Sequence, residues 1–240
     1  MPVPRVTVSV VSHRQNTLVN GLLDDLGQSC GEDIAVVLTQ NVPDPVPFAA
    51  DKLAFSSEVI ANGNPKGFGT NHNAAFARCR TPFFCVANPD IRLRSNPFPA
   101  LLESLREDRV GAAGPAVRNP SGALEDSARR FPTAASLLQK LIVRSSGPDY
   151  PVDQGPIEVD WVAGMFMVFR SEVFRAVGGF DEAYFLYYED VDLCRRLHAT
   201  GKSVLYNPKA EVVHDARRAS RRDLALMRHH AASMLRFLLR

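Results

Sequence analysis

The sequence predicts an α/β protein: a three-layer α/β/α sandwich with a mostly parallel central sheet. Short β-branched or apolar runs alternate with helical patterns in the first half of the chain, which is the order of parallel strands joined by crossover helices. These runs are almost continuously apolar, as in strands that are buried on both faces. The 240 residues and the 45% apolar content fit one large domain of this class.

The first half of the chain supplies four expected strands and two helices. The strands are Val6–Val11, Ile34–Thr39, Val59–Ala61 and Phe83–Ala87. A helix is expected from a cap at Asn16 or Thr17 through about Leu26, and Ala74–Cys79 has a second helical pattern. Ligand sites in parallel sheets lie at the carboxyl ends of the strands.

Polar residues follow two of these strands directly. His13 and Arg14 come after the first strand and Asn41 comes after the second, so we expect all three at the same edge of the sheet. A surface or packed imidazole is the alternative for His13, because a site needs several converging groups.

A glycine-rich loop, Asn62–Asn73, leads into the second helix. Its three glycines allow close backbone approach, and Thr70 is a candidate helix cap. A helix N-terminus with Lys66 beside it suits a diphosphate or a polar nucleoside edge. The pattern is neither a Walker loop nor Gly-x-Gly-x-x-Gly, so a plain turn before a helix is the alternative.

The buried strand Phe83–Ala87 ends in Asn88–Pro89–Asp90. An acid at a central strand's end, with an amide two residues earlier, can hold a divalent cation through oxygen ligands. With the preceding Gly-Phe-Gly-x-Asn loop, this segment resembles the Asp-x-Asp element of GT-A glycosyltransferases. More narrowly, the chain resembles family 2 glycosyltransferases of the bacterial rhamnosyltransferase-like type, with Asn88 at the position of the first metal-motif Asp.

The resemblance implies a GT-A glycosyltransferase domain at residues 1–216, one half of which is a Rossmann-like nucleotide-binding unit. The expected donor is the nucleotide sugar dTDP-rhamnose. By resemblance, the residues that bind it are His13, Arg14, Asn41, Lys66, Gly67, Asn71, Asn88, Trp161 and Gly164. The acceptor is expected to be a hydroxyl of a glycan or of a polyprenyl-diphosphate-linked sugar.

The second half of the chain supplies the remaining expected elements. Helices are expected at Pro97–Arg109, near Leu137–Val143 and over Glu189–Ala199. Strands are expected at Val110–Pro115, Ile157–Val162, Met165–Arg170, Ser203–Asn207 and Ala210–Val213. The composition of the segment Ser145–Pro156, rich in Ser, Gly and Pro, predicts a mobile loop that is either a lid or an ordinary surface loop.

An acidic stretch near residue 190 is the strongest candidate for chemistry. Gly178–Tyr188 begins with a Gly pair and contains five aromatic residues, and Glu189 and Asp190 then open a helix. Burial beside aromatic residues raises the pKa of a carboxyl group, whereas a helix N-terminus favours its ionised form. A carboxylate between these influences suits a general base. The alternative is that Glu189 and Asp190 only cap the helix while Asp192 pairs with Arg195 or Arg196.

By resemblance, the Glu189–Asp190 pair matches the family's acidic motif and Asp190 takes the position of the general base. In the resembling enzymes the segment Asp160–Gly164 borders the donor sugar and the acceptor. Trp161, the chain's only tryptophan, suits stacking on a sugar, although a core tryptophan is the alternative. His214 takes the position of a metal ligand beside Asp90, which implies Mg²⁺ or Mn²⁺; a surface histidine without function is the alternative.

Residues 217–240 form a basic, amphipathic C-terminal segment. From Ala216 to Arg240 there are seven Arg and one acid, and apolar residues follow a helical stripe over Leu224–Leu238. This helix can pack on the domain, on a second subunit in a homodimer, or on an anionic membrane surface. A net charge of +2 and the lack of a recognised motif argue against nucleic acid as a partner.

The four cysteines form no Cys-x-x-Cys pair, and the sequence contains no signal-peptide-like or membrane-spanning run. We therefore expect a cytoplasmic protein. If its C-terminal segment binds lipid, the protein would be peripheral on the inner face of the cell membrane. The predicted reaction is inverting, metal-dependent sugar transfer in cell-surface polysaccharide synthesis. An inactive or partner-dependent nucleotide-sugar-binding subunit, a nucleotidyltransferase and a nucleic-acid-binding protein are the rival hypotheses.

Overall fold

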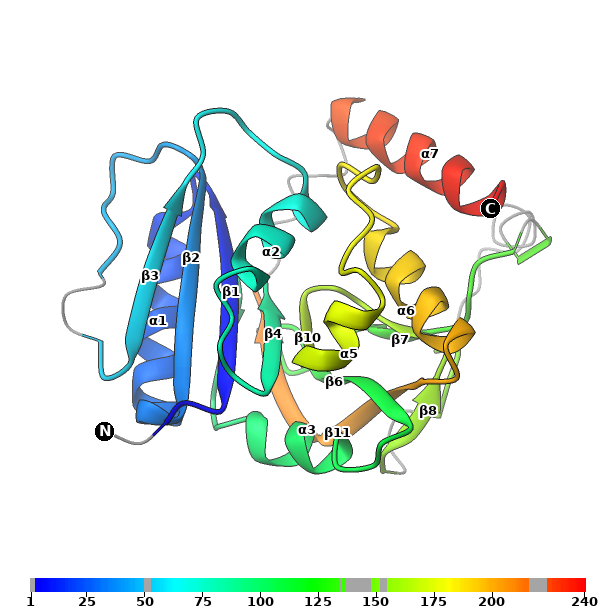
Figure 1. Ribbon diagram of the computed structural model, residues 1–240, viewed down its shortest axis with the longest axis horizontal. Coiled ribbons are helices and arrows are strands. Elements are labelled where there is room, and N and C mark those ends of the chain that lie inside the picture. The colour runs from blue at the N-terminus through cyan, green and yellow to red at the C-terminus, as the bar shows by residue number, and fades with distance from the viewer. Residues whose placement is uncertain (1–2, 50–52, 134, 137–147, 152–154, 216–223) are drawn as a thin grey trace.

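The computed structural model describes residues 3–49, 53–133, 135–136, 148–151, 155–215 and 224–240. The helix expected near Leu137–Val143 and much of the loop Ser145–Pro156 lie outside the described residues. Figure 1 shows a central sheet with helices in front of it and behind it. The sandwich predicted from the sequence is therefore confirmed.

The large sheet has nine strands in the order β3-β2-β1-β4-β10-β6-β11-β5, with β8 also paired to β11. The first four are β3 (Ser56–Ala61), β2 (Ile34–Val42), β1 (Val6–His13) and β4 (Phe83–Ala87). They pair in parallel, with Val8 opposite both Val36 and Cys85. This is the half in which the sequence predicts the nucleotide site.

The other half of the sheet is mixed. β10 (Phe166–Arg170) runs antiparallel to both β4 and β6 (Val110–Arg118), and β6 pairs in parallel with β11 (Ser203–His214). The short strands β5 (Ile91–Arg92) and β8 (Ile157–Val159) are antiparallel to β11. β7 (Ala128–Arg129) and β9 (Trp161–Val162) form a separate small ladder.

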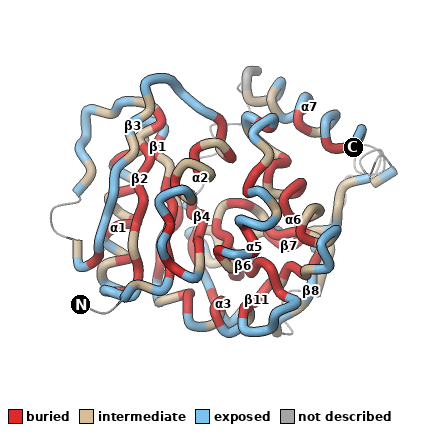
Figure 2. Tube along the Cα trace, in the orientation of Figure 1, coloured by how far each residue is buried: buried red, intermediate tan, exposed pale blue. Residues whose placement is uncertain are grey.

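The sheet divides the core into two hydrophobic clusters, one on each face. Figure 2 shows buried residues along the strands and on the helices that flank them. One cluster contains the apolar faces of α1 (Asn16–Cys30) and α3 (Phe98–Ser104). The other contains residues of α5 (Ser171–Ala176), α6 (Glu189–Ala199) and α7 (Leu224–Leu238), and Phe76 of α2 (Phe68–Phe76) packs against it. A 3-10 turn, η1 (Gly31–Asp33), connects α1 to β2.

Several predicted boundaries were wrong. α2 begins at Phe68, so the glycine-rich loop supplies the first turn of the helix and Thr70 lies inside it rather than capping it. α1 begins at Asn16 with Gln15 as its N-cap, so neither Asn16 nor Thr17 caps it, and it continues to Cys30, one turn beyond Leu26. The two strands expected after residue 203 form one strand, β11, whose register shifts between Asn207 and Glu211.

Candidate functional site

A cavity of about 490 Å³ opens at the carboxyl ends of β1, β2 and β4, within the size range of small-molecule sites. Predicted site residues on its wall are His13, Asn41, Lys66, Asn71, Asn88 and Asp90. The opposite wall comes from the segment Phe185–Tyr187 and from Leu226 and His229 of α7. Residues from both ends of the chain therefore meet at one site.

Asn41 organises the nucleotide side of the cavity through its buried side chain. Its Oδ1 accepts the backbone N–H of Lys66 at 2.8 Å and the amide of Asn62 at 2.9 Å. Its Nδ2 donates to the Lys66 carbonyl at 2.9 Å. Asn71 joins the same network, donating to that carbonyl at 3.1 Å and accepting from Asn62 at 2.7 Å. These amides fix the loop and leave the exposed Lys66 side chain free to reach a ligand.

His13 and Arg14 behave differently at the end of β1. His13 lines the cavity, with its Nδ1 lying 3.3 Å from Asn41 Nδ2. Arg14 is exposed, has a φ of 59° and does not line the cavity. Its role in donor binding stays a prediction.

Gly67 joins the nucleotide loop to the acidic half of the molecule. A Cβ atom at this position would lie 2.7 Å from the Phe185 carbonyl oxygen, closer than van der Waals contact allows. The neighbouring Phe68 N–H donates to the same oxygen at 2.8 Å. Only glycine permits this approach, which closes the cavity on one side.

The segment after β4 places Asp90 between the cavity and β11. The Asp90 carbonyl accepts the Asp215 N–H at 2.9 Å, and Asn88 is held through its N–H to the Met165 carbonyl at 2.8 Å. Asp90 Oδ2 lies 3.4 Å from His214 Nε2, whereas Asp90 Oδ1 is buried without a hydrogen-bond partner. An unsatisfied buried carboxylate oxygen is a ready ligand for a cation.

His214 lies between two carboxylates. Its Nδ1 is 2.9 Å from Glu125 Oε2, on the side of the ring away from Asp90. Burial acts to lower the pKa of His214, but the hydrogen bonds to Asp90 and Glu125 outweigh it and raise the pKa to about 9. The described residues contain no group of three or more His, Cys, Asp or Glu that could hold a metal ion. Asp90 and His214 nevertheless fit Mg²⁺ or Mn²⁺, which commonly take one or two protein ligands and complete their shell with substrate phosphates and water.

Asp190 is held rigidly at the first turn of α6. Its Oδ2 accepts the Gly164 N–H at 2.8 Å and its Oδ1 accepts the Val191 N–H at 2.8 Å. A Cβ atom on Gly164 would lie 3.2 Å from the Asp190 Cβ, so the glycine lets the two segments approach. Gly164 thus has a defined role, positioning Asp190. Neither residue belongs to the cavity wall itself.

Glu189 and Asp190 titrate as a pair. Burial, followed by the negative charge of Asp190, raises the pKa of Glu189 to about 8. Burial also raises the pKa of Asp190, opposed by the backbone N–H groups of Gly164 and Val191. Glu189 Oε2 has no partner and the residue is 5% exposed. Asp190 accepts from the N–H groups of Gly164 and Val191 as well as from its own, whereas Glu189 accepts only from its own N–H, so a negative charge shared by the pair is better stabilised on Asp190.

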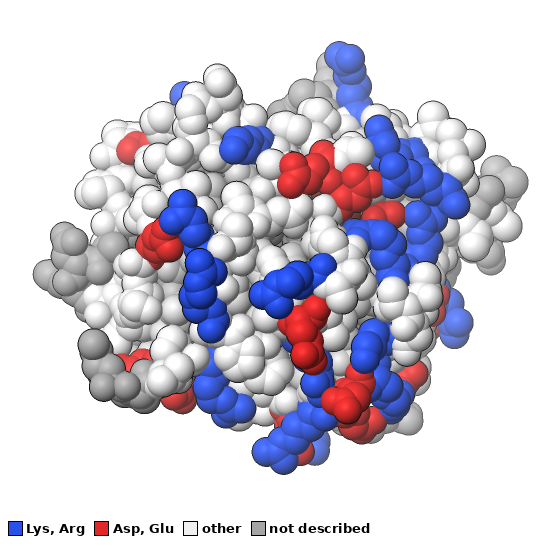
Figure 3. All heavy atoms as spheres, viewed as in Figure 1, with Lys and Arg blue, Asp and Glu red and all other residues white. Residues whose placement is uncertain are grey.

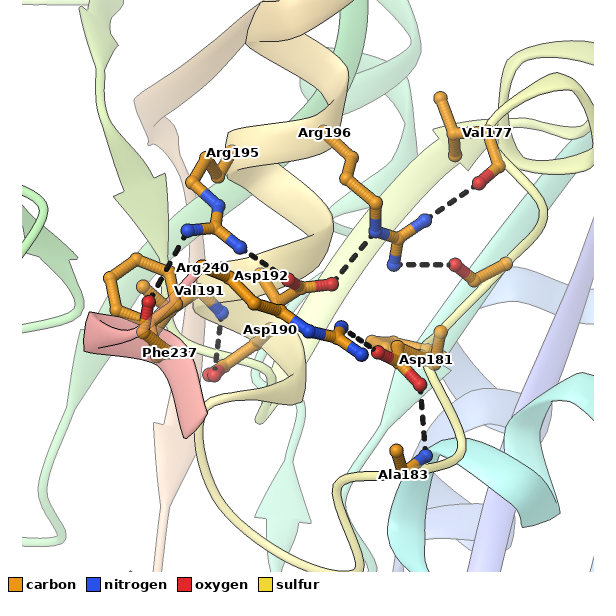
Figure 4. Close-up of polar contacts among 12 residues, drawn as sticks. Val177, Asp181, Ala183, Asp190, Val191, Asp192, Arg195, Arg196, Phe237 and Arg240 are labelled. Atoms are coloured by element: carbon orange, nitrogen blue, oxygen red, sulfur yellow. Dashed lines mark hydrogen bonds and ion pairs between the residues drawn. The ribbon is translucent and has the colours of Figure 1, made fainter. Parts of the chain in front are cut away.

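Asp192 has a structural role, as the alternative interpretation proposed. It is 1% exposed and binds both Arg195 at 2.9 Å and Arg196 at 2.7 Å (Figure 4). Arg196 also donates to the carbonyls of Val177 and Gly179. Asp192 therefore anchors the glycine turn to α6 through Arg196, whereas Asp190 is hydrogen-bonded to backbone N–H groups and to no arginine.

The backbone immediately before Glu189 is strained. Tyr187 and Tyr188 have φ values of 70° and 67°, a conformation that bulky residues rarely adopt and that clusters at functional sites. Helix α7 packs on this segment: His229 stacks on Phe185 at 4.7 Å, and His230 contacts the rings of Tyr187 and Tyr188. The packing of α7 helps to hold the strained turn.

The C-terminal helix is also pinned by polar contacts. Ser233 Oγ donates to the Leu186 carbonyl at 2.9 Å, and Arg240 forms an ion pair with Asp181. The Arg195 guanidinium lies 4.4 Å from the centre of the Phe237 ring. Of the three partners considered for this helix, the described residues show contacts with the domain itself. Figure 3 shows basic side chains gathered at the upper right, on the face that carries α7.

Trp161 lies in the core rather than on the cavity wall. It is 9% exposed, its Nε1 donates to the Arg130 carbonyl at 2.9 Å, and the Arg129 guanidinium lies 5.5 Å from the ring centre. In this structure the indole supports the small β7–β9 ladder. Stacking of Trp161 on a sugar stays a prediction.

His72 is a cavity-lining residue to which the sequence analysis gave no role. The side chain is almost fully buried, its Nδ1 lies 2.7 Å from Ser9 Oγ, and its Nε2 has no partner. Burial lowers the pKa of His72 to about 3, so the ring is neutral. Its place in the glycine-rich loop was visible in the sequence, but its orientation toward the sheet was not.

Comparisons with known proteins agree with this geometry. Residues 4–232 match the family described as "Glycosyltransferase like family 2". The chain is 31% identical to the N-acetylglucosaminyl-diphospho-decaprenol L-rhamnosyltransferase of Mycobacterium tuberculosis (strain ATCC 25618 / H37Rv), covering 98% of this chain and 83% of that protein. It is 27% identical to the rhamnosyltransferase WbbL of Escherichia coli (strain K12), covering 98% of this chain and 93% of the relative.

Solved structures share the fold at lower sequence identity. GalNAc-T7 with UDP, GalNAc and Mn²⁺ superposes with a TM-score of 0.66 at 14% identity, covering 90% of this chain and 44% of that one. The mannosyltransferase PcManGT from Pyrobaculum calidifontis, in complex with GDP-Man and Mn²⁺, gives 0.61 at 16% identity over 91% of this chain and 59% of that one. The GT-A fold expected by resemblance is confirmed, and the chain belongs to glycosyltransferase family 2.

Proposed function

We propose that this glycosyltransferase moves L-rhamnose from dTDP-rhamnose to a hydroxyl of a lipid-linked sugar, with inversion at the anomeric carbon. The names of the two relatives, both rhamnosyltransferases, support the sugar. One of them carries the diphospho-decaprenol acceptor in its name, which supports a lipid-linked acceptor here. The role of such a product is in cell-surface polysaccharide synthesis.

The general base in this reaction is Asp190. Its carboxylate is ionised beside a protonated Glu189 and is fixed by two backbone N–H groups. The acceptor hydroxyl gives its proton to Asp190 while its oxygen attacks the anomeric carbon and the bond to the nucleoside diphosphate breaks. A positioned base of this kind typically contributes about 10²- to 10⁴-fold to the rate. The Asp190 carboxylate, held by the Gly164 and Val191 N–H groups, is the observation on which the proposal rests.

The donor occupies the cavity on the Asn41 side. His13, Lys66 and the loop amides face this space, and the N-terminus of α2 lies beside it, as suits a diphosphate. Asp90 and His214 would hold Mg²⁺ or Mn²⁺, and that cation supplies Lewis-acid stabilisation of the leaving diphosphate when bound. The positive charge of Lys66 acts on the same group.

A donor panel tests the proposal. Purified protein is incubated with a polyprenyl-diphosphate-linked N-acetylglucosamine acceptor and dTDP-rhamnose, UDP-glucose or GDP-mannose, with Mn²⁺ or with a chelator. We expect a rhamnosylated lipid only with dTDP-rhamnose and Mn²⁺, and NMR of the product should show the inverted anomer. Transfer from another donor would refute the sugar assignment. Nucleotide-sugar binding without any transfer would favour an inactive or partner-dependent subunit.

We further propose that the outward face of α7 meets the membrane that carries the acceptor. Met227 and Leu235 of this helix are each 57% exposed, and Leu239, just past its end, is 78% exposed. The exposed Arg228 and Arg236 adjoin Met227 and Leu235 in the sequence. Apolar residues next to arginines suit the surface of an anionic bilayer. No described helix is long and apolar enough to cross a membrane.

Vesicle flotation tests this surface. The variant Leu235→Ser/Leu239→Ser should bind phosphatidylglycerol-containing vesicles less than the wild type does, and neutral vesicles should bind neither protein well. Val59→Ser, at a 48% exposed residue of β3, is the matched control. Equal binding by all variants would exclude the membrane role. Sedimentation of the protein without lipid would then show whether the helix serves a second subunit in a homodimer.

A further inference from the structure

Glu125 lies in the segment that follows β6, beside the end of that strand, and no role was predicted for it. Its N–H donates to the Val117 carbonyl at 2.7 Å, which fixes the backbone as the chain turns away from the sheet. Its Oε2 then reaches His214 Nδ1 at 2.9 Å. Both side chains are largely buried, at 24% and 15% exposure.

The other edge of the same imidazole faces the cation ligand Asp90. Strand β5 pairs with β11 so that Ile91 lies opposite His214, which brings the preceding residue, Asp90, to within 3.4 Å of His214 Nε2. Asp90 Oδ1 remains buried without a partner. The imidazole ring of His214 therefore lies between the carboxylates of Glu125 and Asp90.

Ring orientation matters because a histidine can bind a cation only through a nitrogen that carries no proton. Because a cation displaces the proton from the nitrogen that it binds, a carboxylate that accepts from Nδ1–H leaves Nε2 as the nitrogen that gives up its proton, and it also holds the orientation of the ring. Glu125 is the carboxylate placed to do this. The adjacent Asp126 instead pairs with Arg129 at 2.9 Å.

We infer that Glu125 is a positioning residue for a divalent cation: it orients His214 so that Nε2, together with Asp90, presents a preformed pair of ligands. This inference rests on the cation site of the proposed function. The side-chain partner of Glu125 is His214, so in this inference Glu125 acts on the cation through His214. Its loss should affect cation affinity and ligand geometry before any effect on the fold.

Mn²⁺ binding, measured by electron paramagnetic resonance in the presence of dTDP, tests the inference without an activity assay. Glu125→Ala should weaken Mn²⁺ binding by about 10- to 100-fold, the usual effect of losing such an outer partner, and should reduce the nitrogen coupling of the bound ion in the pulsed spectrum. Glu125→Gln keeps an oxygen that can accept from Nδ1–H, so it should restore most of both signals. Asp126→Asn removes a neighbouring charge and leaves the Glu125–His214 contact in place. Its Mn²⁺ affinity and nitrogen coupling should match those of the wild type.

Each other outcome overturns the inference. Unchanged Mn²⁺ affinity and nitrogen coupling in Glu125→Ala would show that His214 orients itself, while the cation site would stand. Equal losses of Mn²⁺ affinity in Glu125→Ala and Asp126→Asn would show that the effect comes from the local negative charge and not from the orientation of His214. A wild type that binds dTDP but no Mn²⁺ would refute the cation site itself and the inference with it. Circular dichroism melting of each variant identifies losses that come from unfolding.

Discussion

The two sides of the site are built from different interactions. On the nucleotide side, uncharged amides satisfy one another and the loop backbone, with Asn41 making four polar contacts and Lys66 left exposed. On the acidic side, Asp192 is nearly inaccessible and neutralised by two arginines, and Glu189 is buried without a countercharge.

This difference shows how one fold separates binding from chemistry. Amide networks shape a loop at little electrostatic cost, because neutral groups lose less hydration free energy than charged groups do when they are buried. Buried carboxylates are costly, and they control where a proton and a negative charge reside. The acidic side should thus depend strongly on charge and pH, and the nucleotide side should not.

The largest expected effect comes from breaking the buried ion pairs of the acidic side. Asp192→Ala leaves Arg195 and Arg196 without their carboxylate and should reduce the free energy of unfolding by about 3–5 kcal/mol. Chemical denaturation measures this loss. Glu211→Ala, which breaks an exposed pair with Arg118, is the control and should cost no more than about 1 kcal/mol. Similar small losses of unfolding free energy in Asp192→Ala and Glu211→Ala would mean that ion pairs do not stabilise the acidic side.

On the nucleotide side, Asn41→Ala should have a smaller effect on stability and a marked effect on binding. It removes the partners of the Lys66 N–H and of Asn62, at a cost of about 1–3 kcal/mol. Because the loop loses its fixed shape, dTDP should bind more weakly in calorimetry. The control Asn20→Ala removes amide contacts to Pro47 and Ala49, away from the cavity. Equal dTDP affinity in all three proteins would show that the network does not shape the nucleotide site.

A pH-dependent effect on stability is expected from the pair Glu189–Asp190. Since the folded pKa of Glu189 is about 8 and its unfolded value is near 4.3, the folded state holds more protons between these pH values. Stability should therefore fall as pH rises through this window. In Glu189→Gln that loss disappears, so its melting temperature relative to the wild type should increase from pH 5 to pH 8.5. A difference that does not change with pH would contradict the proposed protonation of Glu189.

Local patterns were sufficient to predict most of the sheet and the order of the site segments. The apolar runs at Val6–Val11 and Phe83–Ala87 became central strands. Asn41 lies near the end of β2 and Asp90 follows β4, and both line the cavity. Apolar periodicity depends on residues near one another in the chain, so the sequence carries it directly. The bounds of α7 were predicted for the same reason.

Long-range contacts could not be predicted in this way. The partner of His214, Glu125, is 89 positions away in the chain, and no local pattern indicates which carboxylate meets which ring. The approach of Gly67 to the Phe185 carbonyl depends on how two distant loops pack. The same holds for His229 of α7, whose side chain completes a cavity formed largely by the first 90 residues.

The separation of binding from chemistry is tested most directly with Asp190→Asn. The substitution keeps the size of the side chain and removes its ability to accept the acceptor's proton. Rhamnosyl transfer should fall by about 10²- to 10⁴-fold, while calorimetry with dTDP-rhamnose and Mn²⁺ should give a donor affinity close to the wild type. Transfer at the wild-type rate would contradict Asp190 as the base, and loss of donor affinity together with transfer would show that the two sides are not separate.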